Sequence, residues 1–160
     1  MARFSIKGPK FDGAFCTVDT FRHLLTDIEA ISHLENVARH LVKNGIYVLG
    51  LHLLPRQDIK NKIHRWKGRR GNLTVYSKIN VLEVNRKRRK ETLGYTLRVD
   101  EKIYRSIYKL HTYTLSQFKK LLDEAGCFEI INVYDLDYDL KHPLKLDQES
   151  EEAVFILRKA

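Results

Sequence analysis

Two apolar runs on either side of a helical stretch shape the first third of the chain. Residues 11–19 begin with an apolar run and close on Asp19, and residues 46–51 form an unbroken apolar run too short for a helix. Such a run is typical of a strand buried on both faces, and strands of this kind belong to parallel sheets with helical crossovers. The pattern therefore predicts a strand, a helix and a second, parallel strand.

The helix between these strands is marked at both ends. Thr26 and Glu29 have the spacing of a capping box, which satisfies backbone N–H groups at a helix start. Asn44-Gly45 predicts the helix end, because glycine enters the left-handed conformation without steric cost. The apolar side chains between them recur at helical spacing and form one stripe: Ile28, Ile31, Leu34, Val37, Ala38, Leu41 and Val42.

The hydrophobic period changes to two at residue 72. Residues of one face alternate with polar residues as far as residue 113, which predicts an antiparallel β meander over residues 72–113. The basic run at residues 86–90 falls at its first turn. The preceding polar stretch, residues 55–71, predicts a loop or a short irregular helix. The alternating apolar positions are Leu73, Val75, Ile79, Val81, Leu93, Tyr95, Leu97 and Val99.

A second capping box opens the last part of the chain. Thr114 and Gln117 predict a helix start, and Gly126 predicts its end. Two further apolar runs, residues 128–134 and 153–157, predict two more strands. The hydrophobic pattern thus describes one α/β unit with a β insertion.

Composition narrows the class of protein. A length of 160 residues with 43% hydrophobic content suits a single globular domain, and no apolar run approaches the roughly 20 residues that span a bilayer. The two cysteines, Cys16 and Cys127, lie in apolar surroundings, which favours buried free thiols in a reducing cytoplasm.

The net charge of +9 and pI near 9.6 favour polyanionic partners. A nucleic-acid-binding module is therefore one alternative, with its charge supplied by residues 86–90 and by the cluster at residues 56–70. A solvated turn explains residues 86–90 equally well, and no aromatic RNA-recognition motif accompanies them. Any such binding is expected to be non-specific.

The sequence lacks the residue patterns that metal binding, phosphate binding and nucleophilic catalysis require. His33 and His40 share a helix face but lie about 10 Å apart, too far to hold one zinc ion. There is no CxxC pair and no glycine cluster that would cradle phosphate. Cys16 lies in a predicted strand, where packing is the commoner role.

Polar side chains do follow both predicted parallel strands. Thr17, Asp19, Thr20 and His23 come after the first strand, and His52 comes after the second. Ligands of open α/β sheets bind outside the carboxyl ends of the strands, so these residues form a candidate site. A capping turn at Asp19-Thr20 and a histidine at the sheet rim are the alternatives.

In its order of elements the chain resembles the class I S-adenosylmethionine-dependent methyltransferases. Residues 11–24 (FDGAFCTVDTFRHL) are similar to the fourth strand of that family and its following loop, where a Phe-Asp pair opens the strand and an Asp-Ser/Thr pair closes it. Residues 34–49 are similar to the helix, turn and fifth strand that follow, with Asn44-Gly45 in place of a Pro-Gly-Gly turn. Residues 113–128 resemble the last helix leading into strand six, residues 153–159 the antiparallel strand seven, and residues 72–113 a β flap.

This resemblance implies a partial Rossmann-like, methyltransferase-type α/β sheet with an inserted antiparallel β meander. It implies S-adenosylmethionine as cofactor and a small molecule as methyl acceptor. On the cofactor side it points to Cys16, Asp19, Thr20 and His23, and on the substrate side to His52 and Tyr113.

The glycine-rich loop after strand one and the acidic residue after strand two of that family have no counterpart among residues 1–160. We therefore expect a single domain corresponding to the C-terminal part of the fold, a fragment that binds S-adenosylmethionine weakly or not at all by itself.

The same comparison bears on assembly. In the family the fourth strand lies between strands one and five, and only the second neighbour is present here. An apolar edge strand at residues 11–19 has neither proline nor lysine to protect it. We expect a homodimer or larger homo-oligomer formed through this edge or through residues 72–113; a structural interaction module is the remaining alternative.

Overall fold

The computed structural model describes residues 1–57, 63–137 and 139–160, which form two compact units. The first unit joins residues 1–57 to residues 113–160, and the second comprises residues 58–112. The strands of the predicted flap, residues 72–113, fall largely in the second unit. The description of residues 1–160 as a single domain stays a prediction.

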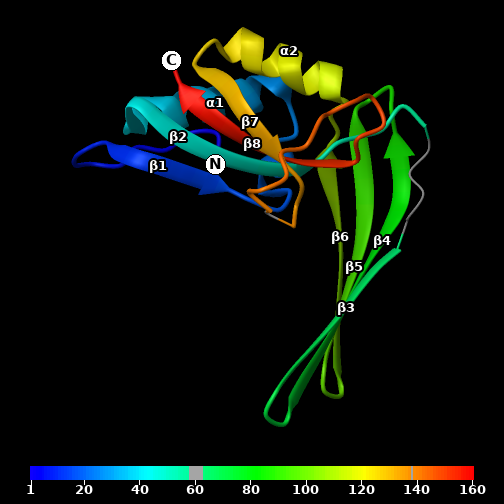
Figure 1. The fold of residues 1–160 in the computed structure, drawn as a ribbon. Helices are drawn as coiled ribbons and strands as arrows, with labels where there is room; N and C mark the ends of the chain where they lie inside the picture. The colour runs from blue at the N-terminus through cyan, green and yellow to red at the C-terminus, as the bar shows by residue number, and fades with distance from the viewer. Residues whose placement is uncertain (58–62, 138) are drawn as a thin grey trace. The chain divides into compact units, whose positions relative to one another are not determined.

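The first unit is a four-stranded sheet with two helices packed together on one face (Figure 1). The strand order is β1-β2-β8-β7, in which β1 and β2 are parallel and β8 runs antiparallel to both of its neighbours. The predicted parallel crossover and the predicted antiparallel last strand are confirmed. The elements are β1 (Phe11–Cys16), the 3-10 helix η1 (Thr20–His23), α1 (Asp27–His40), β2 (Leu41–His52), α2 (Leu115–Ala125), β7 (Phe128–Tyr134) and β8 (Glu152–Lys159).

Both predicted capping boxes form. The Thr26 hydroxyl accepts from the Glu29 backbone N–H at 3.2 Å, and the Glu29 carboxylate accepts from the Thr26 N–H at 3.1 Å. Thr114 and Gln117 make the same reciprocal pair at the start of α2, and Gly126 follows α2 in the left-handed conformation, as predicted.

The predicted end of the first helix is wrong. The helix α1 ends at His40, and Leu41 is already extended and pairs with Phe11 of β1. Asn44, with φ of 63°, and Gly45 instead lie in an irregular part of β2. A Cβ at Gly45 would lie 3.0 Å from the Val42 carbonyl oxygen and 3.1 Å from the Leu41 Cβ, so this glycine permits a close approach of backbone within the strand.

The core of the first unit lies between the sheet and the helices. Alternate residues of β2 and β8 point toward the helices and are fully buried, because side chains alternate across a strand. Aromatic rings fill the centre, with Phe118 contacting Phe155 at a centroid distance of 4.5 Å. The largest fully buried side chains are Tyr47, Tyr113, Phe21, Phe118, Phe155, Leu34, Leu41, Leu49, Leu51 and Leu157.

The second unit is a strongly twisted antiparallel sheet of order β3-β4-β5-β6 (Figure 1). Its strands are β3 (Ile63–Arg70), β4 (Leu73–Asn85), β5 (Lys90–Val99) and β6 (Lys102–His111). The predicted meander is confirmed as β4, β5 and β6, and residues 86–89 form its first turn.

Residues 63–70 were predicted as loop or irregular helix, and this prediction is wrong because they form the edge strand β3, paired with β4 over its whole length. Nearly every residue of this strand is exposed, so its sequence shows no alternation of apolar and polar residues. The rest of the predicted loop includes residues 58–62, which lie outside the described residues. Among the described residues, no helix has both the length and the apolar character needed to cross a membrane.

Candidate functional site at the carboxyl ends of two parallel strands

The candidate site lies where β1 and β2 end side by side. Because these neighbouring strands are parallel, their carboxyl ends meet at one edge of the sheet. The chain leaves β1 after Cys16, makes a tight turn and enters the 3-10 helix η1 at Thr20, while β2 ends at His52. Asp19 and His52, which are 33 residues apart, are thereby brought together.

The turn that carries Asp19 has an uncommon backbone. Val18 and Asp19 have φ values of 50° and 62°, in the left-handed region that β-branched residues rarely adopt. Each such residue costs on the order of 1–3 kcal/mol and persists where its surroundings hold it. Here the Asp19 N–H donates to the Gly50 carbonyl of β2 at 3.3 Å. The strained turn ends β1 earlier than the predicted residues 11–19 and fixes the position of the Asp19 carboxylate.

The Asp19 carboxylate accepts three hydrogen bonds. Its Oδ2 accepts from His52 Nδ1 at 2.7 Å, and its Oδ1 accepts from the His52 backbone N–H at 2.8 Å. The guanidinium of Arg22, which is 4% exposed, donates to the same Oδ1 at 3.1 Å. Two side chains and one backbone group therefore hold this carboxylate from two elements.

These contacts shift the ionisation of both partners. Burial by itself would raise the pKa of Asp19, but the hydrogen bond from His52 and the charge of Arg22 outweigh burial and lower that pKa well below its usual range. The hydrogen bond to Asp19 raises the pKa of His52 against the opposing effects of burial and of Arg22. Asp19 is thus a carboxylate at neutral pH, and His52 is a stronger base than an ordinary histidine.

A second carboxylate faces the other side of the imidazole. Glu152, the first residue of β8, places its Oε2 3.7 Å from His52 Nε2, and its charge also raises the pKa of His52. The His52 side chain is 37% exposed. Its Nδ1–H is held by Asp19, which leaves Nε2 as the nitrogen that can exchange a proton with a ligand.

Arg22 and Glu152 were missed by sequence reasoning. Arg22 follows Asp19 at the i+3 spacing of a helical ion pair, a signal that could have identified it. Glu152 gave no signal, because its proximity to His52 follows from the pairing of β2 with β8.

The four residues predicted on the cofactor side do not line one cavity. Cys16 and Thr20 line a cavity of about 300 Å³ together with apolar and aromatic residues that include Phe4, Phe11 and Phe15. Asp19 is bonded to His52 and Arg22, and His23 is exposed and lines a different hollow near Glu29. The assignment of these four residues to a cofactor stays a prediction.

Cys16 is a partly buried free thiol. Burial raises its pKa, although a hydrogen bond to the Tyr47 hydroxyl opposes this effect. Tyr47 contacts His33 Nε2 at 2.9 Å, and His33 Nδ1 lies 3.2 Å from the Met1 carbonyl oxygen, to which it can only donate. His33 therefore accepts from Tyr47, and this chain of hydrogen bonds holds the Cys16 side of the cavity in place.

Tyr113, predicted on the substrate side, is a fully buried core residue. Its ring packs against Phe21 and Phe118 at centroid distances of 6.0 and 5.9 Å, and its carbonyl accepts from the Leu54 N–H. Its role toward a substrate stays a prediction. Within residues 1–57, 63–137 and 139–160, no group of three or more His, Cys, Asp and Glu side chains is arranged to hold a metal ion.

The fold is similar to that of part of several S-adenosylmethionine-dependent methyltransferases. An S-adenosylmethionine-dependent methyltransferase from Clostridium acetobutylicum is similar with a TM-score of 0.70, at 14% identity over 98% of this chain and 61% of its own. CalS10, an amino pentose methyltransferase from Micromonospora echinaspora, has a TM-score of 0.69 at 18% identity, covering 99% of this chain and 62% of its own. The CcbJ methyltransferase from Streptomyces caelestis has a TM-score of 0.70 at 14% identity, covering 99% and 65%.

The TM-scores establish a similarity of fold. The chain spans about three fifths of the length of these methyltransferases. No family model matches its sequence. No curated protein matches it either.

Proposed function

We propose that this chain takes part in methyl transfer from S-adenosylmethionine to the nitrogen of a small amine, with His52 as the group that accepts the proton. The Asp19–His52 pair at the carboxyl ends of two parallel strands carries the proposal. Support comes from the fold, from the raised pKa of His52, and from the 2.7 Å hydrogen bond that fixes the imidazole.

The chemistry requires one proton acceptor. When bound, S-adenosylmethionine supplies an electrophilic methyl group; the amine nitrogen forms a bond to the methyl carbon, and the carbon–sulfur bond breaks. His52 Nε2 takes the proton that the nitrogen loses, and the imidazolium that forms lies between the carboxylates of Asp19 and Glu152. Positioning of the amine beside His52 provides the other contribution to rate.

The proposed acceptor is an amino sugar. CalS10 is described as an amino pentose methyltransferase, and KedS8 from a Streptoalloteichus species, with a TM-score of 0.63 at 16% identity, as a sugar N-methyltransferase. In this chain Asp19 and Glu152 place two negative charges beside His52, and Arg22 offsets one of them. The remaining negative charge favours a cationic amine, which gives a proton to His52 Nε2 before its nitrogen attacks. A neutral hydroxyl of the same sugar would gain less from this charge.

The donor would lie beside β1. The cavity lined by Cys16 and Thr20 is bordered by aromatic rings, which suit a purine face, and this is the observation that fits the adenosine of the donor. We also propose that the sheet is part of a Rossmann-like sheet and that residues 1–160 correspond to its C-terminal part. The absence of a glycine-rich loop from these residues and the length of the similar chains support this.

The test is a methyl-transfer assay with labelled S-adenosylmethionine at millimolar concentration, so that weak donor binding does not hide turnover. A panel of amino sugars is compared with the corresponding hydroxy sugars. We expect label in the amino sugars only, and loss of transfer in His52→Gln. The matched control is His142→Gln, since His142 also pairs with an aspartate, Asp139, at 2.7 Å but in an exposed loop. No label in any amino sugar, or equal loss in both variants, would reject the proposal.

A further inference from the structure

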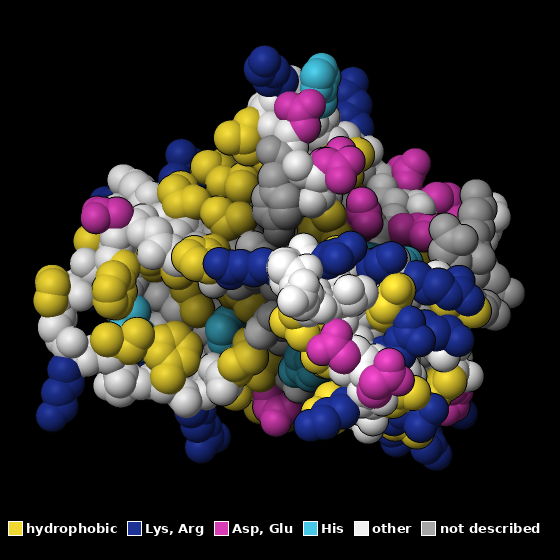
Figure 2. Space-filling view, turned by 90° about the horizontal axis from the view of Figure 1, so that it is seen from below, with side chains coloured by type: hydrophobic (Ala, Val, Ile, Leu, Met, Phe, Trp, Pro, Cys, Tyr) yellow, Lys and Arg dark blue, Asp and Glu magenta, His cyan; other side chains and the backbone are white. Residues whose placement is uncertain are grey.

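The positive charge of this protein is concentrated in the second unit. Residues 63–112 contain fourteen Lys and Arg and four Asp and Glu, whereas the rest of the chain contains fifteen and sixteen. Residues 63–112 therefore carry a net charge of +10, and the rest of the chain carries −1. In Figure 2, Lys and Arg side chains are gathered on one part of the surface, interspersed with hydrophobic ones.

The register of the sheet places much of this charge on one face. Residues that pair directly across strands share a face, and the pairs Arg65–Lys78, Lys67–Tyr76 and Tyr76–Arg98 follow one another across β3, β4 and β5. On this face, the strand residues between positions 63 and 80, 94 and 98, and 103 and 107 include no Asp or Glu; Asp100, in the turn after β5, lies opposite Thr74. Its basic residues are Arg65, Lys67, Arg69, Lys78, Arg98 and Arg105.

This arrangement costs stability. Arg65 and Lys78 stand directly opposite each other, and like charges in that position destabilise a sheet. Neither Arg65 nor Lys78 pairs across the strands with an acidic residue that would offset the repulsion. An anionic ligand bound between them would offset the repulsion.

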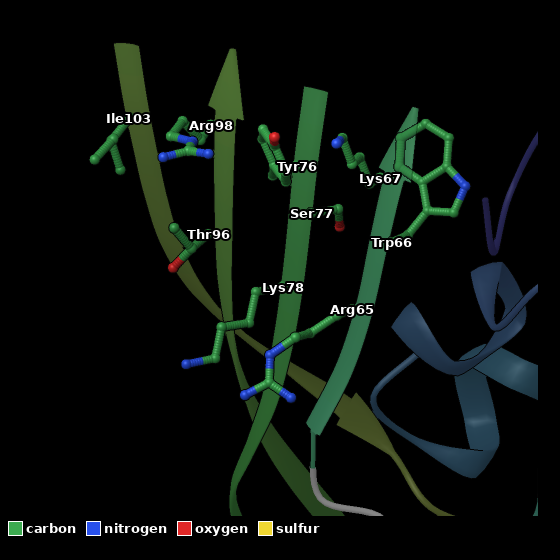
Figure 3. Close-up of a pocket in the computed structure, with 9 residues that line it drawn as sticks. All are labelled: Arg65, Trp66, Lys67, Tyr76, Ser77, Lys78, Thr96, Arg98 and Ile103. Carbon is green, nitrogen blue, oxygen red and sulfur yellow. The ribbon is translucent and has the colours of Figure 1, made fainter. Parts of the chain in front are cut away.

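The face is hollowed into a shallow groove of about 370 Å³, which we call the basic groove (Figure 3). Arg65 and Lys78 lie together toward one end, and Lys67, Tyr76 and Arg98 stand in a row across three strands toward the other. The two groups are two residues apart along β4, or about 7 Å. The basic groove is thus cationic at both ends.

The apolar part of the basic groove on this face comes from Tyr76 and Ile103. The Arg98 guanidinium carbon lies 4.2 Å and the Lys67 Nζ 5.2 Å from the centroid of the Tyr76 ring, so two cations hold this phenol in place. The hydrogen bond from Lys67 lowers the pKa of Tyr76. Trp66 pairs with Ser77 and therefore points to the face opposite Lys67; it is 62% exposed at the edge of β3, and its ring lies over Gly68.

We propose that the basic groove binds single-stranded nucleic acid, with phosphates at Lys67 and Arg98 and at Arg65 and Lys78, a base against Tyr76 between them, and the strand continuing past Trp66 at the edge of β3. Cationic ends joined by an aromatic surface fit an exposed base on an anionic backbone. In a duplex the bases stack on one another, so only the phosphates would be available to the basic groove. This binding is independent of methyl transfer.

Trp66 makes the proposal directly testable, because it is the only tryptophan of the chain. The full chain is titrated with a fluorescein-labelled oligothymidylate, and binding is followed by anisotropy. A parallel titration with the unlabelled strand follows Trp66 fluorescence. We expect both signals to give the same dissociation constant. Binding that leaves Trp66 fluorescence unchanged would place the ligand elsewhere and overturn the proposal.

Two double variants separate the basic groove from general charge. Lys67→Ser with Arg98→Ser is expected to weaken binding about tenfold or more and to reduce the salt slope by about 2. Lys87→Ser with Arg88→Ser removes the same charge from the exposed first turn and should change affinity less than threefold. Equal losses would show diffuse electrostatic attraction. If circular dichroism shows that the first double variant does not fold, Arg98→Lys replaces it, since this substitution keeps the charge. We expect Arg98→Lys to lower the affinity severalfold, because lysine lacks the planar guanidinium group.

Competition decides the class of partner. Unlabelled single strand should displace the probe at a concentration at least tenfold lower than duplex of the same length. The proposal would be overturned if duplex displaced the probe at the same concentration as single strand. It would also be overturned if phosphatidylserine vesicles displaced the probe at a lower phosphate concentration than single strand does.

Discussion

Oδ2 of Asp19 lies 2.7 Å from Nδ1 of His52, and the same carboxylate also accepts the His52 backbone N–H at 2.8 Å. The pair joins the turn after β1 to the last residue of β2. It orients the imidazole through two separate hydrogen bonds, so the ring position depends on the strained turn at Val18 and Asp19 as much as on the strand. Structure and ionisation are coupled at this point.

Asp19→Asn should therefore change stability in a pH-dependent way. The folded-state pKa of Asp19 is lowered. The carboxylate therefore contributes to the free energy of unfolding above the unfolded pKa of about 3.9, and this contribution is lost as pH falls. The folded-state pKa of His52 is raised. Protonated His52 therefore contributes to the free energy of unfolding below the unfolded pKa of about 6.5, and this contribution is lost as pH rises through the folded-state pKa. The pair stabilises most between about pH 4 and pH 6.5.

Urea unfolding of the two proteins from pH 5 to pH 9 measures this difference. We expect the variant to be less stable by about 1–3 kcal/mol at pH 6, with the gap narrowing above pH 7. His142→Gln, in the exposed pair with Asp139, should show a smaller and flatter difference. A gap that widens as pH rises would contradict the assigned pairing.

Gly45→Ala should destabilise the first unit. The added Cβ would lie 3.0–3.2 Å from backbone oxygens of Val42 and Asp12, which cannot move without disturbing β2. The expected loss is about 1–3 kcal/mol of unfolding free energy in urea. Gly13→Ala is the matched control in the neighbouring strand, since its nearest atom is the Ile46 carbonyl oxygen at 3.6 Å, an ordinary contact. An equal effect of both substitutions would contradict this account.

Local signals in the sequence predicted local structure well. Thr26 with Glu29 and Thr114 with Gln117 identified both helix starts, because a capping box is complete within four residues. The signal at Asn44 failed because tertiary pairing of Leu41 with Phe11 ended the helix four residues earlier. The strand β3 was invisible, since an exposed basic edge strand has no hydrophobic period.

The candidate site was predictable only in part. Asp19 and His52 were each identified by their place after a strand, but nothing in the sequence indicated that they bond to each other. Glu152 reaches His52 through strand pairing, which depends on residues a hundred positions apart. The contact between Glu152 and His52 exists because β2 pairs with β8. No short stretch of sequence indicates which strands pair, so this contact could not be predicted.

Binding of S-adenosylmethionine by residues 1–160 should be weak. The glycine-rich loop and ribose carboxylate of the similar family have no counterpart in this sequence, so the chain offers only the cavity beside Cys16 and Thr20. Isothermal titration calorimetry should give a dissociation constant near or above the millimolar range. Whatever binding remains should weaken in Thr20→Val and stay unchanged in Thr92→Val, which alters the second unit. Micromolar binding would contradict the expectation.

The last prediction concerns assembly of copies through β1. This strand lies at the end of the sheet order, with β2 on one side and no strand on the other among the described residues. Phe15 of β1 is 81% exposed, and an apolar edge strand without proline or lysine pairs readily with another chain.

We propose a homodimer in which the β1 strands of two copies meet, since symmetric contacts are the commonest solution for such surfaces. Sedimentation equilibrium at micromolar concentration should give a mass of two chains of 18.8 kDa, and Phe15→Lys should shift the distribution to monomer. Ile28→Lys is the control, because it adds the same charge at a residue that is 80% exposed but lies on α1 and not on the edge strand. Dissociation by Ile28→Lys but not by Phe15→Lys would locate the interface on the helix, and a monomeric unaltered protein would exclude the dimer.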